Sequence, residues 1–381
     1  MEQHENISLK TLDELDYEEK RRDIPLFTYL TLVFVTGIFG NTVVLHIFNK
    51  SYTRSTFRLF VIYLSSVDLL SCTFGIPIEI VALIFGLKNV NSILCKALAF
   101  FTALPTITSV LLLLAISFDR YRKICRPFLW QITYKGARNI FIISVSVSFA
   151  CSALRSVTFG SRPTTFEMYN VTIITCEVTE DMEKSVIAII APNLIGGLFL
   201  IVISLIITLY CCIAVRIGKQ MHTKRKMLGK GINKTKGNKN GNINPSMSDT
   251  KNNQGQISEF KTDANENSTA KQSDQNDMPH NIEISQDPKQ HPGKLSNLKQ
   301  TNSNRSAFVM FMVTIAFFLS FAPAFPLIFI KSSIESNLER TLYKFFIRSY
   351  LLNCVVNPII YGFFDPQFRR LCKMFFSCRQ V

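Results

Sequence analysis

Repeated long apolar runs constrain this chain more than any other feature of its sequence. They recur from about residue 25 to 48, from 57 to 85 and onward, and each is long enough for a helix to cross a lipid bilayer. The 381 residues are 48% hydrophobic and only 18% charged, although they include a long polar insert. The sequence therefore predicts an all-α integral membrane protein rather than two or three soluble domains.

The charge pattern predicts how the chain is oriented. The net charge of +15 is concentrated beside the apolar runs, for example at Lys50, Arg54 and Arg58 and again at Arg216 and Lys219. Basic loops stay in the cytoplasm, so this excess is an orientation signal and not a nucleic-acid surface. Residues 1–23 carry eight acids against four bases and show no signal-peptide pattern. We expect them to be extracellular, with the first run acting as its own insertion signal.

The apolar runs and polar segments predict five regions. Residues 1–23 form a disordered extracellular N-terminus, 24–217 contain crossings one to five, and 218–305 form a disordered cytoplasmic loop. Residues 306–363 contain crossings six and seven, and 364–381 form a short amphipathic helix and a tail. The 218–305 segment is rich in Asn, Lys, Ser, Gln and Gly, and has no periodicity that predicts a folded domain.

Two motifs carry polar groups into apolar runs. Asp119, Arg120 and Tyr121 end the third run, and Asn357-Pro358-Ile359-Ile360-Tyr361 lies inside the seventh. A basic helix end that snorkels to the interface is the simplest interpretation of the first motif. The second is hard to explain as inert core, because an unsatisfied amide in hydrocarbon costs several kcal/mol.

With these motifs the chain resembles the rhodopsin-like (class A) receptors that couple to G proteins, and in particular the peptide receptors among them. The resemblance covers nearly all of the chain except the two polar segments. It implies a seven-transmembrane helix bundle in the plasma membrane, an extracellular N-terminus and no enzymatic activity. A transporter or channel is disfavoured, since the sequence shows neither an inverted repeat nor pathway charges on several helices.

The resemblance also assigns roles to particular positions. The residues implied in G-protein coupling and activation are Asp119, Arg120, Tyr121, Phe128, Tyr210, Phe317, Phe321, Pro323, Asn357, Pro358 and Tyr361. An allosteric sodium ion would be held by Asp68, Ser109, Asn353 and Asn357, and no other cofactor is expected. Arrestin and receptor kinases are expected to act on the cytoplasmic side, together with the G protein.

The second outer loop carries a strand pattern and a cysteine. Residues 171–179 are rich in β-branched side chains, which favours a strand-like hairpin. An outer loop lies in an oxidising compartment, and the resemblance implies a disulfide between Cys95 and Cys176. The triplets that begin at Asn6 and Asn170 predict N-glycosylation. Cys372 and Cys378, in the C-terminal segment, are palmitoylation candidates.

The ligand is the least constrained feature. Thr102 stands where amine receptors carry aspartate, which argues against a monoamine, and the strand-like outer loop resembles that of peptide receptors. An extracellular peptide is therefore the expected ligand, with a lipid, a small organic acid or a non-signalling scavenger role as alternatives. The candidate ligand contacts, each of which also fits a solvated rim position, are Glu79, Thr102, Arg155, Glu177, Phe321, Phe325, Lys331 and Arg348.

Several positions depart from the family pattern. Phe321 replaces the usual tryptophan before Pro323, and Val202 replaces the usual mid-helix proline of the fifth run. Ser303 stands where many relatives carry an acid that holds the third-helix arginine. We expect the missing acid to raise basal activity.

Overall fold

The structure is a computed structural model, and it describes residues 13, 14, 16–85, 91–166, 171–237, 292–327 and 337–377. The chain divides into two compact units, Met1–Lys219 with Lys299–Val381, and Gln220–Leu298. The first unit contains the helical bundle and every candidate functional residue. In the second unit, the described residues are the far ends of two long helices.

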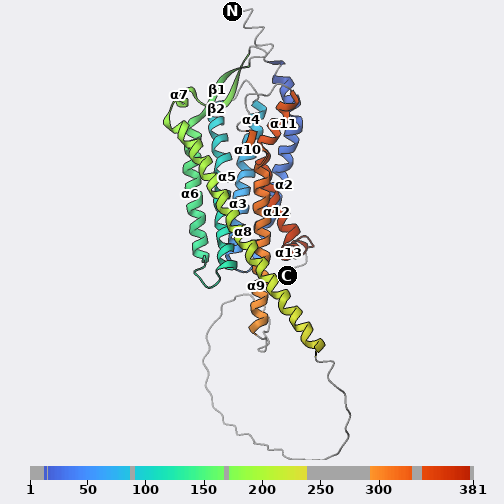
Figure 1. Cartoon of the computed structure of the whole chain (residues 1–381). Coiled ribbons are helices and arrows are strands. Elements are labelled where there is room, and N and C mark those ends of the chain that lie inside the picture. Colours follow the sequence, from blue (N-terminus) through green and yellow to red (C-terminus); the bar gives the residue numbers. More distant parts are fainter. Residues whose placement is uncertain are drawn as a thin grey trace, which may run out of the picture. The chain divides into compact units, whose positions relative to one another are not determined.

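Six helices in the described part of the chain are long and apolar enough to cross a membrane. They comprise α2 (Ile24–Ser51), the consecutive segments α3 (Thr56–Leu70), η1 (Ser71–Gly75) and α4 (Ile76–Phe85), then α5 (Ser92–Cys125), α6 (Tyr134–Thr158), and parts of α8 (Val186–Gly237) and α9 (Pro292–Phe321). Helices α2, α3, α5 and α6 pack side by side in chain order (Figure 1). The chain is therefore a mostly helical, multi-pass membrane protein.

The C-terminal part of the bundle is built from shorter helices. After α10 (Ala324–Leu327) the described chain resumes with α11 (Asn337–Ile347), the 3-10 turn η2 (Ser349–Leu352), α12 (Asn353–Phe364) and α13 (Pro366–Phe376). The continuous apolar helix Ser349–Phe364 is shorter than the six candidate spans. Length alone thus identifies six crossings, and the seventh predicted one remains a prediction.

Polar side chains start four of the helices. Ser55, Asn91 and Thr133 each accept a hydrogen bond from a backbone N–H in the first turn of α3, α5 and α6. Asp365 does the same for α13 through the N–H groups of Gln367 and Phe368. Each cap satisfies donors that the first helical turn leaves without a partner.

Pro77 explains the irregular middle of the second crossing. A proline has no N–H to donate to the carbonyl four residues earlier, and its ring clashes with that carbonyl. The helix meets this clash with the π-helical segment Ser71–Gly75, directly before the proline. The helix thus accommodates Pro77 with a widened turn.

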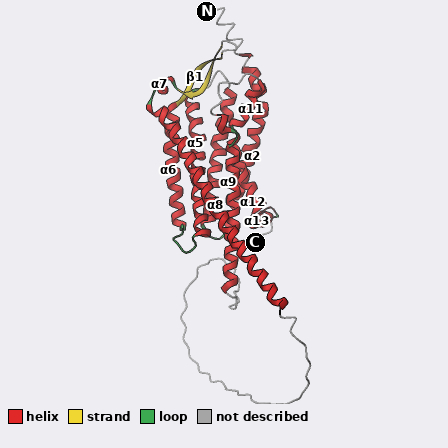
Figure 2. Cartoon of the chain, viewed as in Figure 1, coloured by secondary structure: helices red, strands yellow, loops and turns green. Residues whose placement is uncertain are grey.

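A small hairpin follows α6. Strands β1 (Phe159–Phe166) and β2 (Val171–Val178) pair antiparallel, with Ser161 opposite Cys176 (Figure 2). This matches the strand predicted from the β-branched run, and the pairing places Cys176 next to the start of α5.

Two buried clusters fill the bundle. The larger lies toward the end of α5 that carries Asp119, and includes Phe48, Leu112, Phe317 and Tyr361. The smaller lies toward the other end, around Leu26, Leu30, Cys72, Ile76 and Leu351. Polar candidate residues lie among both clusters.

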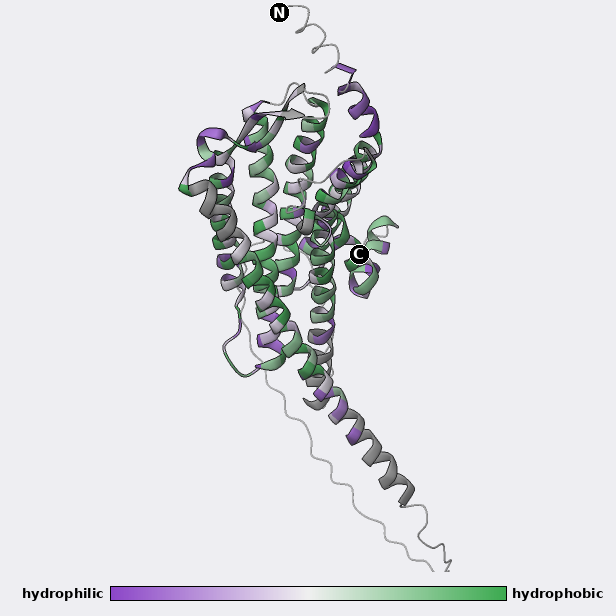
Figure 3. Ribbon diagram, turned by 45° about the horizontal axis from the view of Figure 1, so that its top comes forward, coloured by the Kyte–Doolittle hydropathy of each residue, from purple (hydrophilic) through white to green (hydrophobic). Residues whose placement is uncertain are grey.

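The outer surface of the helices is apolar as well. Large exposed hydrophobic side chains occur on α2, α6, α8 and α9, among them Leu32, Phe39, Ile142, Ile201 and Leu319. Figure 3 shows hydrophobic residues along most of the length of the bundle helices. A helix that is apolar on both its packed and its exposed faces fits a lipid environment.

Several boundaries differ from the sequence-based expectation. Residues 16–22 are helical, where the sequence predicts disorder, because Glu19 and Asp23 pair with Lys344 of α11. Helix α8 continues to Gly237, and α9 begins at Pro292, so both helices extend into the polar segment 218–305. Lysine, methionine and arginine favour helix even where nothing packs against them. Residues 238–291 lie outside the described part.

Candidate functional site

The Asp119–Arg120 pair is buried at the end of α5. The Arg120 guanidinium donates to the Asp119 carboxylate, and Lys123 binds the same carboxylate at 3.0 Å. Thr56 of α3 contacts both Asp119 and Lys123 through its hydroxyl. The Arg120 guanidinium also lies 5.8 Å from the ring centroid of Phe57. The carboxylate thus neutralises the arginine in place, so this helix end does not snorkel as a free basic group.

The activation candidates Tyr210 and Tyr361 do not bind this pair. The hydroxyls of Tyr210 on α8 and Thr314 on α9 form a 3.1 Å hydrogen bond. Tyr361 of α12 is fully buried, and its hydroxyl has no hydrogen-bond partner among the described residues. Arg120 thus binds Asp119, and Tyr210 binds Thr314. The Tyr361 hydroxyl has no hydrogen-bond partner among the described residues.

Aromatic rings connect the C-terminal end of α9 to the turn η2. The rings of Phe317 and Phe321 stack with centroids 4.6 Å apart, and Phe321 lies 5.9 Å from Tyr350. Helix α9 ends at Phe321, directly before Pro323, and a short helix resumes at Ala324. The break in the helix thus coincides with Pro323, which cannot donate a backbone hydrogen bond.

A polar cluster surrounds Asp68 in the middle of the bundle. Asn357 donates to its carboxylate at 2.7 Å, across 289 residues of sequence. Ser109 and Asn353 are buried too, and the Asn357 and Ser65 side-chain oxygens have no partner among the described groups. Buried oxygens that lack hydrogen bonds beside a carboxylate are ligands that a small hard cation accepts. These residues therefore fit the sodium ion that the sequence predicted.

The opposite end of the bundle contains a second buried ion pair. Glu79 of α4 accepts from Arg348 Nε at 2.9 Å and from the Tyr350 hydroxyl at 3.1 Å. The sequence analysis named Glu79 and Arg348 as separate ligand contacts and missed Tyr350. The one feature of the sequence that could have indicated Tyr350 is its position two residues after Arg348. Thr102 uses its hydroxyl within its own helix, bonding to Leu98 O at 2.7 Å.

The structure describes some of the other predicted ligand contacts and not others. Arg155, near the end of α6, is exposed, and its guanidinium lies 4.6 Å from the centroid of the Phe159 ring. Glu177 lies on β2 and is half-buried. The Phe325 side chain and all of Lys331 lie outside the described residues.

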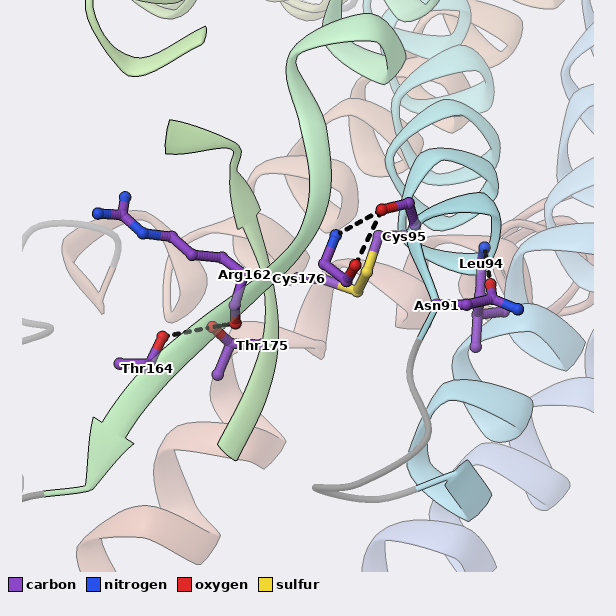
Figure 4. The surroundings of a disulfide bond; sticks show 9 residues. Asn91, Leu94, Cys95, Arg162, Thr164, Thr175 and Cys176 are labelled. Carbon is purple, nitrogen blue, oxygen red and sulfur yellow. Dashed lines mark hydrogen bonds between the residues drawn. A yellow bond between two sulfur atoms is a disulfide. The ribbon is translucent and has the colours of Figure 1, made fainter. Parts of the chain in front are cut away.

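The predicted disulfide is confirmed. Cys95 and Cys176 are bonded, with Cα atoms 5.2 Å apart, and join the start of α5 to the hairpin (Figure 4). Ser92 and Ser161 support the same junction through a 2.8 Å hydrogen bond between their hydroxyls. The hairpin is thereby fixed at the end of the bundle that holds Glu79 and Arg348.

The loop after α5 presents an exposed apolar side chain. Phe128 is fully exposed, while Arg122 donates to the Trp130 carbonyl at 2.8 Å and orders the turn. Tyr121 is half-buried. Phe128 is therefore accessible to a partner protein.

The modification candidates are only partly described. Asn6, Asn170 and Cys378 lie outside the described residues. Cys372 lies on α13 and packs against the larger buried cluster, and burial raises the pKa of its thiol.

One junction was not predicted at all. Asp365, between α12 and α13, accepts from the Tyr52 hydroxyl at 2.7 Å and from Arg305 of α9 at 3.1 Å. Burial and then the Asp365 carboxylate raise the pKa of the Tyr52 hydroxyl. The three residues tie together three parts of the chain that are far apart in sequence, so spacing could not reveal them.

The fold and these buried motifs define a membrane receptor of one class. Residues 40–361 match the family described as 7 transmembrane receptor (rhodopsin family), which is most of the chain. The chain belongs to this family, as its motifs predicted.

Curated relatives resemble a part of it. They include the cholecystokinin receptor type A of Oryctolagus cuniculus, 27% identical over 150 residues, which are 38% of this chain and 35% of the relative. The gastrin/cholecystokinin type B receptor of Sus scrofa is 29% identical over 31% of this chain and 28% of the relative. The neuropeptide F receptor of Drosophila melanogaster is 32% identical over 30% and 24%. The matches thus span about a third or less of these relatives' length.

Proposed function

We propose that this protein is a plasma-membrane receptor that binds an extracellular peptide and activates a heterotrimeric G protein. The observation that carries the proposal is the buried Asp119–Arg120 pair at the basic end of α5, in a chain of the rhodopsin family. A buried, neutralised arginine at a helix end has little value for the stability of the bundle. Arg120 can have a function if it is released from Asp119 and then binds a partner protein.

The proposed topology has seven crossings. Helix α11, the turn η2 and helix α12 together form the seventh, which brings Asn357 beside Asp68. The basic residues Lys50, Arg54 and Arg58 place the intervening loop in the cytoplasm, so the N-terminus is extracellular. The disulfide then lies on the oxidising side, in keeping with this orientation.

The mechanism is a shift between two packings of the bundle. In the packing described here, Asp119 holds Arg120, and Tyr210 is bonded to α9 through Thr314. A ligand that binds the second packing more tightly moves α9 outward and breaks the Tyr210–Thr314 bond. Arg120 is then available to the G protein, with Phe128 docking beside it.

Further partners follow from the same assignment. A sodium ion held by Asp68, Ser109, Asn353 and Asn357 supplies positive charge for the buried carboxylate and favours the resting packing. Receptor kinases and arrestin act on the cytoplasmic segments. Asn6 and Asn170 carry glycans, and Cys372 and Cys378 carry acyl chains.

A peptide is the ligand class best supported. The three relatives named above are receptors for cholecystokinin, gastrin and neuropeptide F by their names. The hairpin over the end of the bundle forms the wall that an extended peptide can contact. Glu79, Arg155, Glu177 and Arg348 supply charges at this end.

Expression of the chain with a promiscuous G protein, and calcium release on exposure to a peptide library, tests this proposal. We expect a peptide response that Arg120→Ala abolishes at equal surface expression. Lys135→Ala, an exposed cation at the same end of the bundle, is the matched control and should respond normally. A response that survives Arg120→Ala would overturn the assignment.

A further inference from the structure

The buried ion pair at the ligand end leaves part of its arginine free. Glu79 uses one carboxylate oxygen for Arg348 Nε, at 2.9 Å, and the other for the Tyr350 hydroxyl, at 3.1 Å. Arg348 Nη1 donates to the Lys344 carbonyl at 3.2 Å. No described residue accepts from Nη2 of Arg348. A guanidinium has five N–H donors in a planar fork, so one edge of this one remains without an acceptor.

A second arginine lies close to the same tyrosine. Arg155 comes from α6, stacks its guanidinium on the Phe159 ring at 4.6 Å, and interacts electrostatically with Tyr350. The Arg155 side chain is exposed, so a ligand can reach its head group. Among the described residues no carboxylate pairs with Arg155.

Few carboxylates contact these two arginines. Glu79 binds Arg348 directly, and no described carboxylate pairs with Arg155. The nearby acids Glu19 and Asp23 both pair with Lys344. A guanidinium group that keeps donors without acceptors can bind an anion.

From this arrangement we propose that Arg155 and the free edge of Arg348 bind a carboxylate of the ligand. The inference rests on the proposed receptor function and deepens it, since it assigns the ligand an anionic group. Two guanidinium groups form short, charge-assisted hydrogen bonds to a carboxylate with a geometry that a lysine cannot supply. Glu79 and Tyr350 are positioning residues. Tyr350 donates to Glu79, and Glu79 accepts from Nε of Arg348, which leaves Nη2 without an acceptor among the described residues.

The position of this site explains how its occupancy reaches the bundle. The Tyr350 ring lies 5.9 Å from Phe321, which stacks on Phe317 at 4.6 Å. Next to Tyr350, the Ser349 hydroxyl donates to the Ser320 carbonyl of α9 at 2.7 Å. A carboxylate that draws Arg348 and Tyr350 toward Arg155 thus pulls on the end of α9 that lies before the proline break.

The first experiment compares matched peptides on the full-length receptor in cells. Each library peptide is made with and without its carboxylates, as C-terminal acid and amide and with Asp and Glu replaced by Asn and Gln. We expect active peptides to need a carboxylate, and Arg155→Gln to weaken them about 10- to 100-fold, the effect of losing one charge-assisted hydrogen bond. Arg155→Gln should barely change the response to the matched peptide without carboxylates. In a double-mutant cycle, this difference shows that Arg155 and the carboxylate interact.

Two controls separate recognition from folding. Arg155→Lys keeps the charge and should recover part of the potency. Arg162→Gln removes an arginine of the hairpin that pairs with Glu180 and Glu183, and should leave the potency unchanged. Equal losses for acidic and neutral peptides in Arg155→Gln would overturn the anion site.

The outcomes distinguish this inference from the receptor assignment. If only carboxylate-free peptides activate the protein, and Arg120→Ala abolishes that activation, the receptor assignment holds and the anion site is overturned. If simple mono- and dicarboxylates activate the protein but peptides do not, and Arg155→Gln abolishes that activation, the anion site holds. The proposal of a peptide ligand is then overturned.

A second measurement needs no agonist. The purified full-length receptor in detergent is melted in sodium acetate and, at equal concentration, in sodium chloride and in acetamide. We expect acetate to raise the melting temperature of the native protein more than chloride or acetamide does, and Arg155→Gln to lose that difference. An identical acetate effect in the native protein and in Arg155→Gln would contradict the proposal.

Discussion

The Asp365 junction gives the sharpest prediction about stability. Replacement of Asp365 by alanine removes the cap of α13, the acceptor of the buried Tyr52 hydroxyl and the partner of Arg305. Loss of a helix N-cap costs about 0.5–2 kcal/mol. A buried hydroxyl left without its acceptor costs about 1–3 kcal/mol. The ion pair adds about 0–1 kcal/mol, because the Arg305 side chain is 42% exposed and solvent screens it.

Together these losses predict that Asp365→Ala lowers the free energy of unfolding by about 1.5–6 kcal/mol. Asp365→Asn keeps a good capping side chain and one carbonyl oxygen, so it should cost less than half as much. Thermal unfolding of the purified protein in detergent measures both. Asp181→Ala changes an exposed acid on the short helix Glu180–Glu183 and serves as the control.

The same substitution has a signalling consequence. Arg305 lies on α9, and Asp365 joins it to the α12–α13 junction, so the contact restrains α9 where Ser303 offers no acid. We expect Asp365→Asn and Arg305→Ala to raise signalling in the absence of agonist. Unchanged stability in Asp365→Ala, or basal signalling equal to that of the native protein in both variants, would refute this reasoning.

Three further predictions follow from single contacts. Gly37→Val should destabilise the bundle by about 1–3 kcal/mol, since even a Cβ at Gly37 would overlap Cys72 Sγ; melting of the purified protein measures it. Cys176→Ser opens the bond to Cys95, 81 residues away, and should cost about 2–5 kcal/mol and reduce surface expression, measured by cell-surface staining. Because the pKa of Tyr52 is raised in the fold, its neutral form contributes stability below pH of about 10, which is lost at higher pH. The stability advantage of the native protein over Tyr52→Phe should therefore be constant from about pH 6 to 9 and shrink above about 10 in a pH series of melting curves.

Each of the three has its own control and contrary result. Gly196 has open space around it, so Gly196→Ala should leave the melting temperature unchanged or slightly raised. Equal melting temperatures for Gly37→Val and Gly196→Ala would contradict the close packing of Gly37. Full surface expression and native stability in Cys176→Ser would contradict a structural disulfide. An advantage over Tyr52→Phe that persists unchanged above about pH 10 would contradict the buried hydroxyl.

Much of the architecture could be predicted because it depends on local pattern. The apolar runs located the helices, and β-branched residues located β2. The neighbourhood of Asp68 and Asn357 came from the family motifs, which specify positions in a known bundle. These features need only composition, spacing or a resemblance.

The rest depends on how helices rotate against each other. Glu79 and Arg348 are 269 residues apart, and Tyr52 and Asp365 are 313 apart, so no spacing relates them. Long side chains reach several neighbours, and a small rotation of a helix selects which one they meet. The lengths of α8 and α9 were also missed, because a polar, lysine-rich composition fits a solvated helix as well as a loop.

Nucleotide exchange on a purified G protein tests the central claim most directly. The full-length receptor is reconstituted in lipid nanodiscs with a heterotrimer, and GTP-analogue uptake is followed with and without an active peptide. We predict that the peptide accelerates uptake, and that Arg120→Ala removes the acceleration while peptide binding persists. Uptake that ignores the peptide, or acceleration that survives in Arg120→Ala, would contradict a receptor that signals through the buried Asp119–Arg120 pair.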